Sequence, residues 1–334
     1  MSKIAIDMMG TDLGIKPIIN ALKVFMKKYD DVTFILIGAE KELKATTAAA
    51  KLDNTKYEIF ATTEVIAMTE GMMEVRRKPN SSMVRGTELL RDQKVDALVS
   101  GGSTAAFLAA CHFIVGEISG VLRPAFMPFI PTVNKGKSVL MLDVGANLEN
   151  DAQDLINFAI MASVYAQEIM HNPKPSVAIL NIGEEASKGK DYHKEAYKLL
   201  ENNKNIFFKG NIEPRDITSD FVDIIVTDGF TGNIALKTLE GMAKNLMGVI
   251  KYELTKNFYR KLKAFSLRKA FRGIRETFDY RNNAAALVLG LRAIAVKTHG
   301  SSDEKSWIST LELTRTAVVN DFVQKMTVKL LKGN

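Results

Sequence analysis

The chain has 334 residues, 46% of them hydrophobic and 25% charged, and a net charge of +7. These values are close to globular averages and exclude an intrinsically disordered chain. The charge is uneven, because residues 251–275 hold nine basic residues and one acidic residue, a local excess of +8 that leaves −1 elsewhere. One concentrated basic segment favours a single anionic partner surface and argues against nucleic-acid binding.

Seven short apolar runs that end in glycine predict strands, in chain order IAIDMMG, VTFILIG, DALVSGG, SVLMLDVG, SVAILNIG, DIIVTDG and IAVKTHG. The segments between them carry apolar residues at helical spacing, as over residues 155–166. Strands that alternate with helices predict an α/β fold, a three-layer α/β/α arrangement with a mainly parallel sheet. We expect one large domain over residues 1–334, with a basic amphipathic helical segment at about 245–280.

Six of these predicted strands end in a polar residue followed closely by glycine: Asp7, Ser100, Asp143, Asn181, Asp228 and His299. One such turn more often caps a helix or shapes a loop. Because parallel strands place their carboxyl ends at one edge of a sheet, six of them favour a shared crevice at that edge.

The turns after these strands suit an anion. Glycine-rich turns that open helices present backbone N–H groups and the positive end of the helix dipole. Three have this form, at residues 101–104, 229–233 and 300–302. Nearby cations strengthen the expectation, namely Arg76, Arg77 and Lys78 before a helix start, Lys188 after Glu185, and Lys297 in an apolar run. A solvated basic loop is the alternative for residues 76–78.

Other site chemistries lack their signatures. Neither GxxxxGK[ST] nor GxGxxG follows a strand, so ATP and NAD are not expected, and no GxSxG elbow supports a serine triad. The four histidines lack zinc-site spacing. A magnesium site from Asp7, Asp12, Asp143 and Asp228 is the weaker alternative to our expectation of no metal and no cofactor.

The single cysteine and the first predicted strand indicate the cellular compartment of the protein. Cys111 excludes an intramolecular disulfide and indicates a reducing compartment, and its apolar surroundings favour core packing over a nucleophilic role. The first predicted strand leaves no room for a signal peptide, and no apolar stretch approaches the ~18 to 20 residues of a membrane span. We expect a cytoplasmic protein.

The basic segment has apolar residues at helical spacing, first Leu254, Phe258, Leu262 and Phe265, then Leu267, Phe271 and Ile274 after Ser266. This pattern predicts two basic amphipathic helices with a bend, suited to a membrane surface or an acidic partner, and a dimer-interface hairpin is the alternative. The expected contact residues are Lys256, Phe258, Arg260, Lys261, Leu262, Phe265, Arg268, Lys269 and Arg272.

Several of these motifs occur in the order found in the bacterial phosphate acyltransferase family, PlsX, which the chain resembles from residue 4 to about 305: AIDMMGTD, VSGGSTA, LDVGAN, LNIGEEASKG, GNIEPRD, TDGFTGNIALKTLEG and VKTHGSS. The resemblance implies a fold akin to isopropylmalate dehydrogenase and phosphotransacetylase, and a homodimer. It implies an enzyme that transfers a long-chain fatty acyl group from acyl carrier protein to inorganic phosphate, giving acyl phosphate for phospholipid synthesis. The implied partners are acyl carrier protein, a membrane surface contacted peripherally, and the membrane enzyme that acylates glycerol 3-phosphate.

The chain departs from the family pattern at three places. Gly10-Thr11-Asp12 stands for MGGD, residues 102–106 stand for GNTGA, and residues 283–290 stand for YGGAPLLG. The third change replaces two glycines, at residues 284 and 285, and a proline. The lost glycines keep open the possibility of a scaffold protein of lipid synthesis that has lost catalysis. The rival enzyme is a coenzyme A-dependent phosphotransacetylase-like acyltransferase, which shares the phosphate chemistry.

Direct attack of phosphate on the thioester needs no covalent acyl-enzyme, because a phosphate with a pKa of ~6 is largely dianionic at neutral pH. We predict that Lys297 holds phosphate and that Asn233 or His299 donates to the thioester oxyanion, while general acid and helix cap are the alternatives for His299. The other residues expected around the substrate are Arg77, Lys78, Gly102, Ser103, Thr104, Asp143, Asn147, Asn181, Glu185, Lys188, Asp228, Gly229, Thr231, Gly232 and Ser301. The three aspartates Asp7, Asp143 and Asp228 are expected to organise loops.

Overall fold

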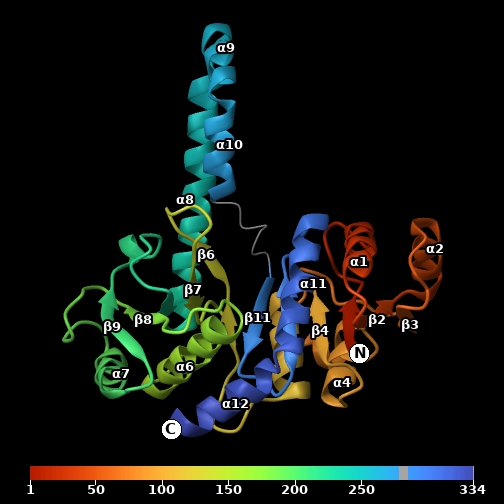
Figure 1. Ribbon diagram of the computed structural model, residues 1–334, viewed down its shortest axis with the longest axis horizontal. Coiled ribbons are helices and arrows are strands. Elements are labelled where there is room, and N and C mark those ends of the chain that lie inside the picture. Colours follow the sequence, from red (N-terminus) through yellow and green to blue (C-terminus); the bar gives the residue numbers. More distant parts are fainter. Residues whose placement is uncertain (278–284, 334) are drawn as a thin grey trace.

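A computed structural model describes residues 1–277 and 285–333. Its strands form two sheets with helices packed against them, and a long helical hairpin projects from this body (Figure 1). All seven predicted strands are present, and most neighbouring strands are parallel. The predicted α/β class with mainly parallel pairing is therefore confirmed, but the strands are divided between two sheets.

The first sheet has seven strands, in the order β3 (Tyr57–Ala61), β2 (Val32–Gly38), β1 (Ser2–Asp7), β4 (Ala97–Ser100), β12 (Ile294–Thr298), β11 (Ala285–Leu289) and β5 (Ala125–Met127). The strands from β3 to β12 are parallel, and β11 is antiparallel to both its neighbours. β1 and β4, the inner strands of the parallel set, are apolar and wholly buried over most of their length, as strands covered on both faces must be.

The second sheet has five strands, in the order β6 (Phe129–Pro131), β7 (Ser138–Leu142), β10 (Ile224–Val226), β8 (Ser176–Leu180) and β9 (Phe207–Ile212). All of its pairs are parallel except β6 with β7. The chain passes from one sheet to the other between β5 and β6, through Pro128.

Helices cover both faces of each sheet. α1 (Lys16–Lys28) and α11 (Glu304–Val319) pack on one face of the first sheet, and α4 (Ser82–Arg91) and α5 (Thr104–Ala110) pack on the other. On the second sheet, α6 (Ala152–Glu168) packs on one face and the start of α8 (Gly229–Thr255) on the other. α12 (Phe322–Gly333), which follows α11, packs on α6 and so joins the two halves.

The remaining short elements lie in the connections between strands. They are α2 (Glu40–Ala50), α3 (Glu74–Arg77), the π-helix η1 (Cys111–Val115), α7 (Asp191–Asn202) and the 3₁₀ turn η2 (Pro214–Asp216).

The projecting hairpin consists of α8 as its ascending arm and of α9 (Phe258–Ser266) and α10 (Arg268–Thr277) as its return (Figure 1). α8, α9 and α10 cover the predicted basic segment up to residue 277. The first predicted helix, from Leu254 to Phe265, is divided between α8 and α9 at residues 256–257, and the predicted bend after Ser266 is the break between α9 and α10. The rest of the predicted segment, residues 278–280, lies outside the described residues. Among the described residues, no helix combines the length and apolar character required to cross a membrane.

We expected the six polar strand ends to share one crevice at one edge of a single sheet, and this is corrected because the strands belong to two sheets. In the first sheet, Asp7 and Ser100 are the last residues of β1 and β4, and His299 follows β12. In the second sheet, Asp143, Asn181 and Asp228 follow β7, β8 and β10. Of the two family glycines that the chain lacks, position 284 lies outside the described residues, and Ala285 begins the buried strand β11. The backbone there follows a regular strand.

Candidate active site

A row of buried polar residues crosses the carboxyl end of the first sheet. Asp7 pairs in register with Ser100, and Ser100 pairs with Lys297 on the next strand, so all three side chains point to the face that α4 covers. They are 1%, 0% and 3% exposed. Burial lowers the pKa of Lys297 to about 8, and the negative charges of Asp7 and Asp12 oppose this effect. Lys297 is therefore mostly protonated at neutral pH.

His299 follows Lys297 at the exposed end of β12. Its Nδ1 lies 2.8 Å from the hydroxyl of Ser301 and accepts a hydrogen bond from the Ser301 amide at 3.2 Å. Because a backbone amide only donates, the neutral ring carries its proton on Nε2. Partial burial, and then the charge of Lys297, lower the pKa of His299. The ring is thus a neutral Nε2–H donor at the sheet edge.

The turn after β4 lies beside this row. Ser100 donates to Asp7 and accepts from the amide of Gly102 at 3.1 Å. A side chain at Gly102 would bring its Cβ within 2.8 Å of the Met83 methyl group. Ser103 caps α5 and donates its hydroxyl proton to the Glu70 carbonyl at 2.6 Å, and Thr104 is exposed at the start of α5. The turn is therefore closely packed against α4, and a side chain at Gly102 would displace the end of Met83.

The second sheet presents a loop organised by Asp143, which is fully buried. Its carboxylate accepts from the amides of Phe126 (3.0 Å), Ala146 (3.2 Å) and Asn147 (2.7 Å), and from the Asn147 side chain (2.9 Å). Burial raises the pKa of Asp143 to about 6 although these hydrogen bonds oppose the rise. Asp143 therefore organises its loop, as expected.

The first turn of α8 packs directly against this loop. A Cβ added at Gly229 would lie 2.2 Å from the carbonyl oxygen of Asn147. A Cβ added at Gly232 would lie 2.0 Å from the carbonyl oxygen of Asp143. Three amides of the turn already donate within the protein, from Gly229 to the Asn150 side chain and from Thr231 and Gly232 to Asp228. The sequence-based explanation, that small residues there leave amides free for phosphate, is corrected: they allow contact between the helix and the loop.

Asp228 caps α8 and is itself held by a residue that the sequence motifs did not single out. Tyr192, in the first turn of α7, donates its hydroxyl proton to the Asp228 carboxylate at 3.0 Å and stacks on His193. Burial opposes ionisation of Asp228, but hydrogen bonds from Thr231 and Tyr192 outweigh it and lower its pKa. A lone tyrosine in an amphipathic helix gives no sequence signal of this contact.

Several residues expected at the substrate lie beneath the surface instead. Asp143, Asn147, Asn181 and Asp228 are each at most 6% exposed, and their polar groups bond to the protein. They support the loops rather than face a ligand. Asn233 differs, since it is exposed on α8 with its side chain against Gly145.

The predicted cations other than Lys297 are paired or solvent-exposed. Lys78 contacts both carboxylate oxygens of Glu70 at 2.6 Å, and Arg77 pairs with Glu74 at 2.8 Å. Glu185 and Lys188 lie exposed in the loop after β8. The expectation that Arg77 and Lys78 hold phosphate is therefore not supported by their contacts.

The ends of the two sheets approach each other across α8. Lys237 and Glu240, two and three turns into that helix, are close enough for their charges to affect the pKa of His299, after burial and Lys297. Asn233 lies four residues before Lys237 and therefore on the same face of α8, the face whose charges act on His299. The three predicted catalytic residues come from different parts of the fold: Lys297 and His299 lie at the end of β12 in the first sheet, and Asn233 lies on α8, which packs on the second sheet.

Similarity to known proteins identifies the family of the chain. The sequence model of a family described as "Fatty acid synthesis protein" matches residues 2–325. A protein named phosphate acyltransferase from Mycoplasma capricolum subsp. capricolum is 48% identical over 333 residues, which cover 100% of this chain and 99% of that protein. A protein of the same name from Mesoplasma florum is 48% identical over 330 residues, covering 99% and 100%. The chain belongs to the phosphate acyltransferase family.

The architecture of this phosphate acyltransferase is shared with a solved structure. The EutD phosphotransacetylase from Staphylococcus aureus matches it with a TM-score of 0.60 and 17% identity, over 95% of this chain and 94% of that one. At that identity the likeness concerns the fold, and it confirms the predicted phosphotransacetylase-like arrangement. As a member of the family, the chain is an acyltransferase.

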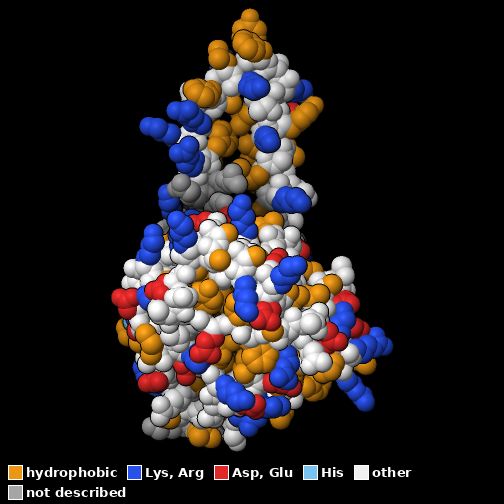
Figure 2. All heavy atoms as spheres, turned by 90° about the vertical axis from the view of Figure 1, so that its right-hand side faces the viewer, with side chains coloured by type: hydrophobic (Ala, Val, Ile, Leu, Met, Phe, Trp, Pro, Cys, Tyr) orange, Lys and Arg blue, Asp and Glu red, His pale blue; other side chains and the backbone are white. Residues whose placement is uncertain are grey.

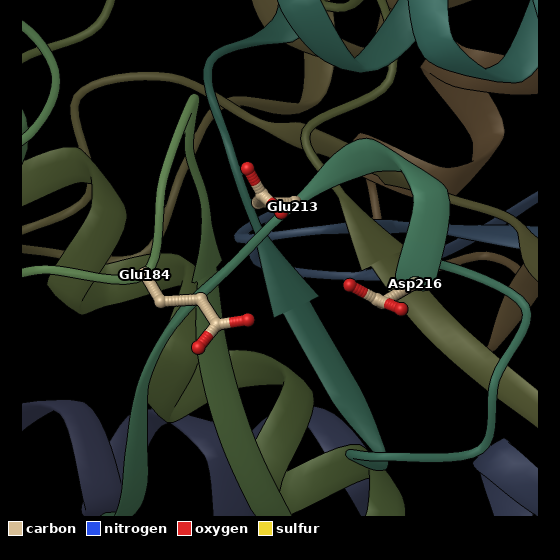
Figure 3. Close-up of side chains that lie close together, drawn as sticks. All are labelled: Glu184, Glu213 and Asp216. Atoms are coloured by element: carbon tan, nitrogen blue, oxygen red, sulfur yellow. The ribbon is translucent and has the colours of Figure 1, made fainter.

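Two further features lie apart from the row of Lys297. Glu184, Glu213 and Asp216 each place a carboxylate oxygen within 4.8 Å of the others, beyond the ends of β8 and β9 (Figure 3). Arg215 pairs with both Glu213 and Asp216, so the positive charge they attract is already supplied by the protein.

Cys111 is fully buried, and burial raises the pKa of its thiol, which confirms core packing over a nucleophilic role.

Proposed function

We propose that this phosphate acyltransferase transfers a long-chain fatty acyl group from acyl carrier protein to inorganic phosphate. A phosphate oxygen attacks the thioester carbonyl, the carbon–sulfur bond breaks, and the proton of the hydrogen phosphate passes to the departing thiolate. The products are acyl phosphate and free carrier thiol. The membrane enzyme that acylates glycerol 3-phosphate is the proposed consumer of the acyl phosphate.

The observation that supports this best is the pair formed by Lys297 and His299. Lys297 is a buried ammonium whose hydrogen bond in the described residues goes to the Thr298 carbonyl, which leaves donor capacity for an anion. His299, two residues on, is a neutral donor suited to an oxyanion. One cation for phosphate and one neutral donor for the carbonyl are what direct attack requires.

The decisive experiment compares donors. Purified protein, inorganic phosphate and palmitoyl thioesters of acyl carrier protein or of coenzyme A are incubated, and acyl phosphate is trapped with hydroxylamine. We expect acyl phosphate with acyl carrier protein and at least ~10-fold less with coenzyme A. The reverse preference would favour the coenzyme A-dependent rival, and no product with either donor would favour a scaffold.

Covalent catalysis is tested by the same reaction without phosphate. The Ser301 hydroxyl contacts the imidazole of His299 at 2.8 Å, a pairing that also occurs in serine nucleophiles. Intact mass spectrometry after exposure to acyl carrier protein alone should find unmodified protein. A stoichiometric acyl adduct that disappears on adding phosphate would replace direct attack by a two-step mechanism.

His299→Ala is expected to lower kcat about 100-fold, because it removes one donor to the oxyanion. The pKa of His299 is lowered, so its neutral form persists as the pH falls to the ordinary histidine value of ~6.5 and is lost only below it. Wild-type kcat should therefore stay level between pH 8 and about 6.5. A kcat that rises as the pH falls over this range would instead assign His299 the role of general acid.

The hairpin carries a surface suited to anionic lipid. Phe258, Tyr259, Leu262 and Phe265 of α9 are 64–78% exposed. Hydrophobic side chains gather at the hairpin tip and between its arms, with Lys and Arg along the sides (Figure 2). We propose peripheral membrane attachment through the α9 residues, with acyl carrier protein meeting the basic flanks.

Leu262→Asp is expected to reduce flotation with vesicles of anionic lipid several-fold, because a carboxylate would enter the apolar layer and be repelled by the headgroups. Phe113→Asp is the matched control, since Phe113 is 72% exposed on the π-helix, away from the hairpin. Flotation should rise with the anionic lipid fraction and fall with salt. Equal flotation of the two variants would contradict membrane attachment through α9.

A homodimer is the proposed assembly. Met242, Leu246 and Val249 expose 55–67% of their surface on the ascending arm, where a second copy would cover them. Light scattering of the full chain without lipid should give twice the mass of 36.9 kDa.

A further inference from the structure

Asp7 is the last residue of β1 and is 1% exposed. Burial raises the pKa of its carboxyl group, and hydrogen bonds from Ser82, Ser100 and the Met9 amide, together with the charge of Lys297, oppose this rise and favour the carboxylate. Its Oδ1 accepts from the Ser82 hydroxyl at 2.6 Å and from the Met9 amide at 3.1 Å. Its Oδ2 accepts from the Ser100 hydroxyl at 2.7 Å. Both oxygens are thus satisfied by uncharged donors from three different segments.

The positive charge closest along the row belongs to Lys297, two strands away across Ser100. In the described part of the chain, no carboxylate lies within the 4.0 Å of a salt bridge from its Nζ. Asp7 acts on it through space, because charge interactions in a buried environment are poorly screened. Direct pairing would have consumed the ammonium donors, whereas a carboxylate held back by serines leaves them available.

The other charged and titratable groups around Lys297 are few. Asp12, in the exposed loop after β1, adds a weaker attraction, and His299 on the same strand is neutral. The elements packed over the row contribute Ser82 and Met83 from α4 and the Gly102 turn, none of which titrates. Asp7 is therefore the principal buried counter-charge of Lys297.

The same carboxylate also connects the surrounding segments. Through Ser82 it holds the start of α4, and through Ser100, which accepts from Gly102, it holds the turn that opens α5. If the carboxylate were displaced, both segments would shift, and the electrostatic attraction that it exerts on Lys297 would change as well.

We infer that Asp7 is a positioning residue, which keeps Lys297 protonated for an anionic substrate without occupying its donors and fixes the two turns beside it. The inference rests on the proposed function for the identity of the anion, phosphate. The arrangement itself, a carboxylate satisfied by serines beside a buried ammonium, is independent of which acyl donor is used.

Asp7→Asn is the test, since asparagine keeps the shape and removes the charge. The titration of Lys297 is followed directly by NMR of protein with ¹³C-labelled lysine, and Lys297→Met assigns the signal. We expect the pKa of Lys297 to fall by about 1 in Asp7→Asn, the size that Coulomb's law gives for a unit charge at ~10 Å, the spacing of two strands, with an effective dielectric constant of ~20. Glu40→Gln is the control, because it removes a carboxylate that pairs with Lys44 at the surface, and it should leave the pKa of Lys297 within about 0.3 of the wild-type value.

Kinetics supply the second measurement. A protonated lysine whose pKa is about 8 loses its charge as the pH rises through that value, so the wild-type KM for phosphate should increase above pH 8. In Asp7→Asn the increase should begin about 1 pH unit lower. An unchanged titration of Lys297 in folded Asp7→Asn protein would overturn the inference, even if wild-type protein forms acyl phosphate. Conversely, a shifted titration in a protein without turnover would uphold the role of Asp7 and reject the proposed function.

If Asp7→Asn folds too poorly for NMR, thermal unfolding of a double-mutant cycle decides the matter. Coupled charges predict that Asp7→Asn lowers the Tm less in a Lys297→Met background than in the wild type. Equal losses in both backgrounds would overturn the inference.

Discussion

Replacing Lys297 with methionine is expected to raise the KM for inorganic phosphate about 10- to 100-fold, while the KM for the acyl donor changes by less than ~2-fold. Hydrogen bonds to a charged group contribute about 1.5 to 3 kcal/mol, and each 1.4 kcal/mol corresponds to a factor of ten. Methionine has similar length and suits an apolar site, so the packing of the 3% exposed side chain should survive. The effect should therefore be confined to the anion.

Steady-state kinetics with each substrate varied in turn measures both constants. Lys44→Met is the matched control, because Lys44 lies on α2 and pairs at the surface with Glu40 at 2.6 Å. Its kinetics should match those of the wild type. Similar increases in both KM values for Lys297→Met would show that the lysine supports the fold of the site and does not bind phosphate.

Gly232→Ala is expected to destabilise the protein by about 3 kcal/mol or more and to lower activity at least ~10-fold. The added Cβ would lie 2.0 Å from the Asp143 carbonyl oxygen and 2.9 Å from the Thr227 methyl group. The backbone of Asp143 has little freedom to yield, because its amide donates to the Thr227 carbonyl at 2.9 Å. Overpacking against backbone is at the upper end of the usual cost of ~1 to 3 kcal/mol.

Gly241→Ala, in the same helix, provides the comparison. Nothing lies within 4 Å of an added Cβ there, so only helix propensity acts, and alanine should stabilise α8 by up to about 1 kcal/mol. Thermal unfolding followed by circular dichroism should therefore place the two variants on opposite sides of the wild type. Equal Tm values would mean that the contact between α8 and the Asp143 loop is not a tight one.

The sequence predicted local structure better than it predicted the arrangement of the sheets. Apolar runs closed by glycine located seven strands, and the bend after Ser266 was foreseen because the apolar spacing restarts there. The allocation of strands to two sheets was not predictable from the strand ends. A polar residue before a glycine marks the carboxyl end of a strand, but it carries no information about which strands are neighbours.

The candidate site combines residues that local sequence patterns singled out with others that they did not. Lys297 and His299 stood out because a lysine in an apolar run and a histidine before glycine need a special environment. Asp7 was expected only to organise a loop, since its distance from Lys297 depends on β4 lying between β1 and β12. Gly229 and Gly232 were given a ligand-based explanation, because sequence cannot distinguish a glycine that faces a substrate from one that faces another loop.

The uninterrupted course of α8 has a mechanical consequence. Its 27 residues form one helix about 40 Å long, whose first turn is fixed against the Asp143 loop and whose other end lies in the projecting hairpin (Figure 1). A helix without a break is rigid, so it keeps the hairpin tip at a fixed distance from the Asn233 turn. A force applied at the hairpin tip is therefore transmitted along α8 to the Asn233 turn and to the Asp143 loop against which that turn packs.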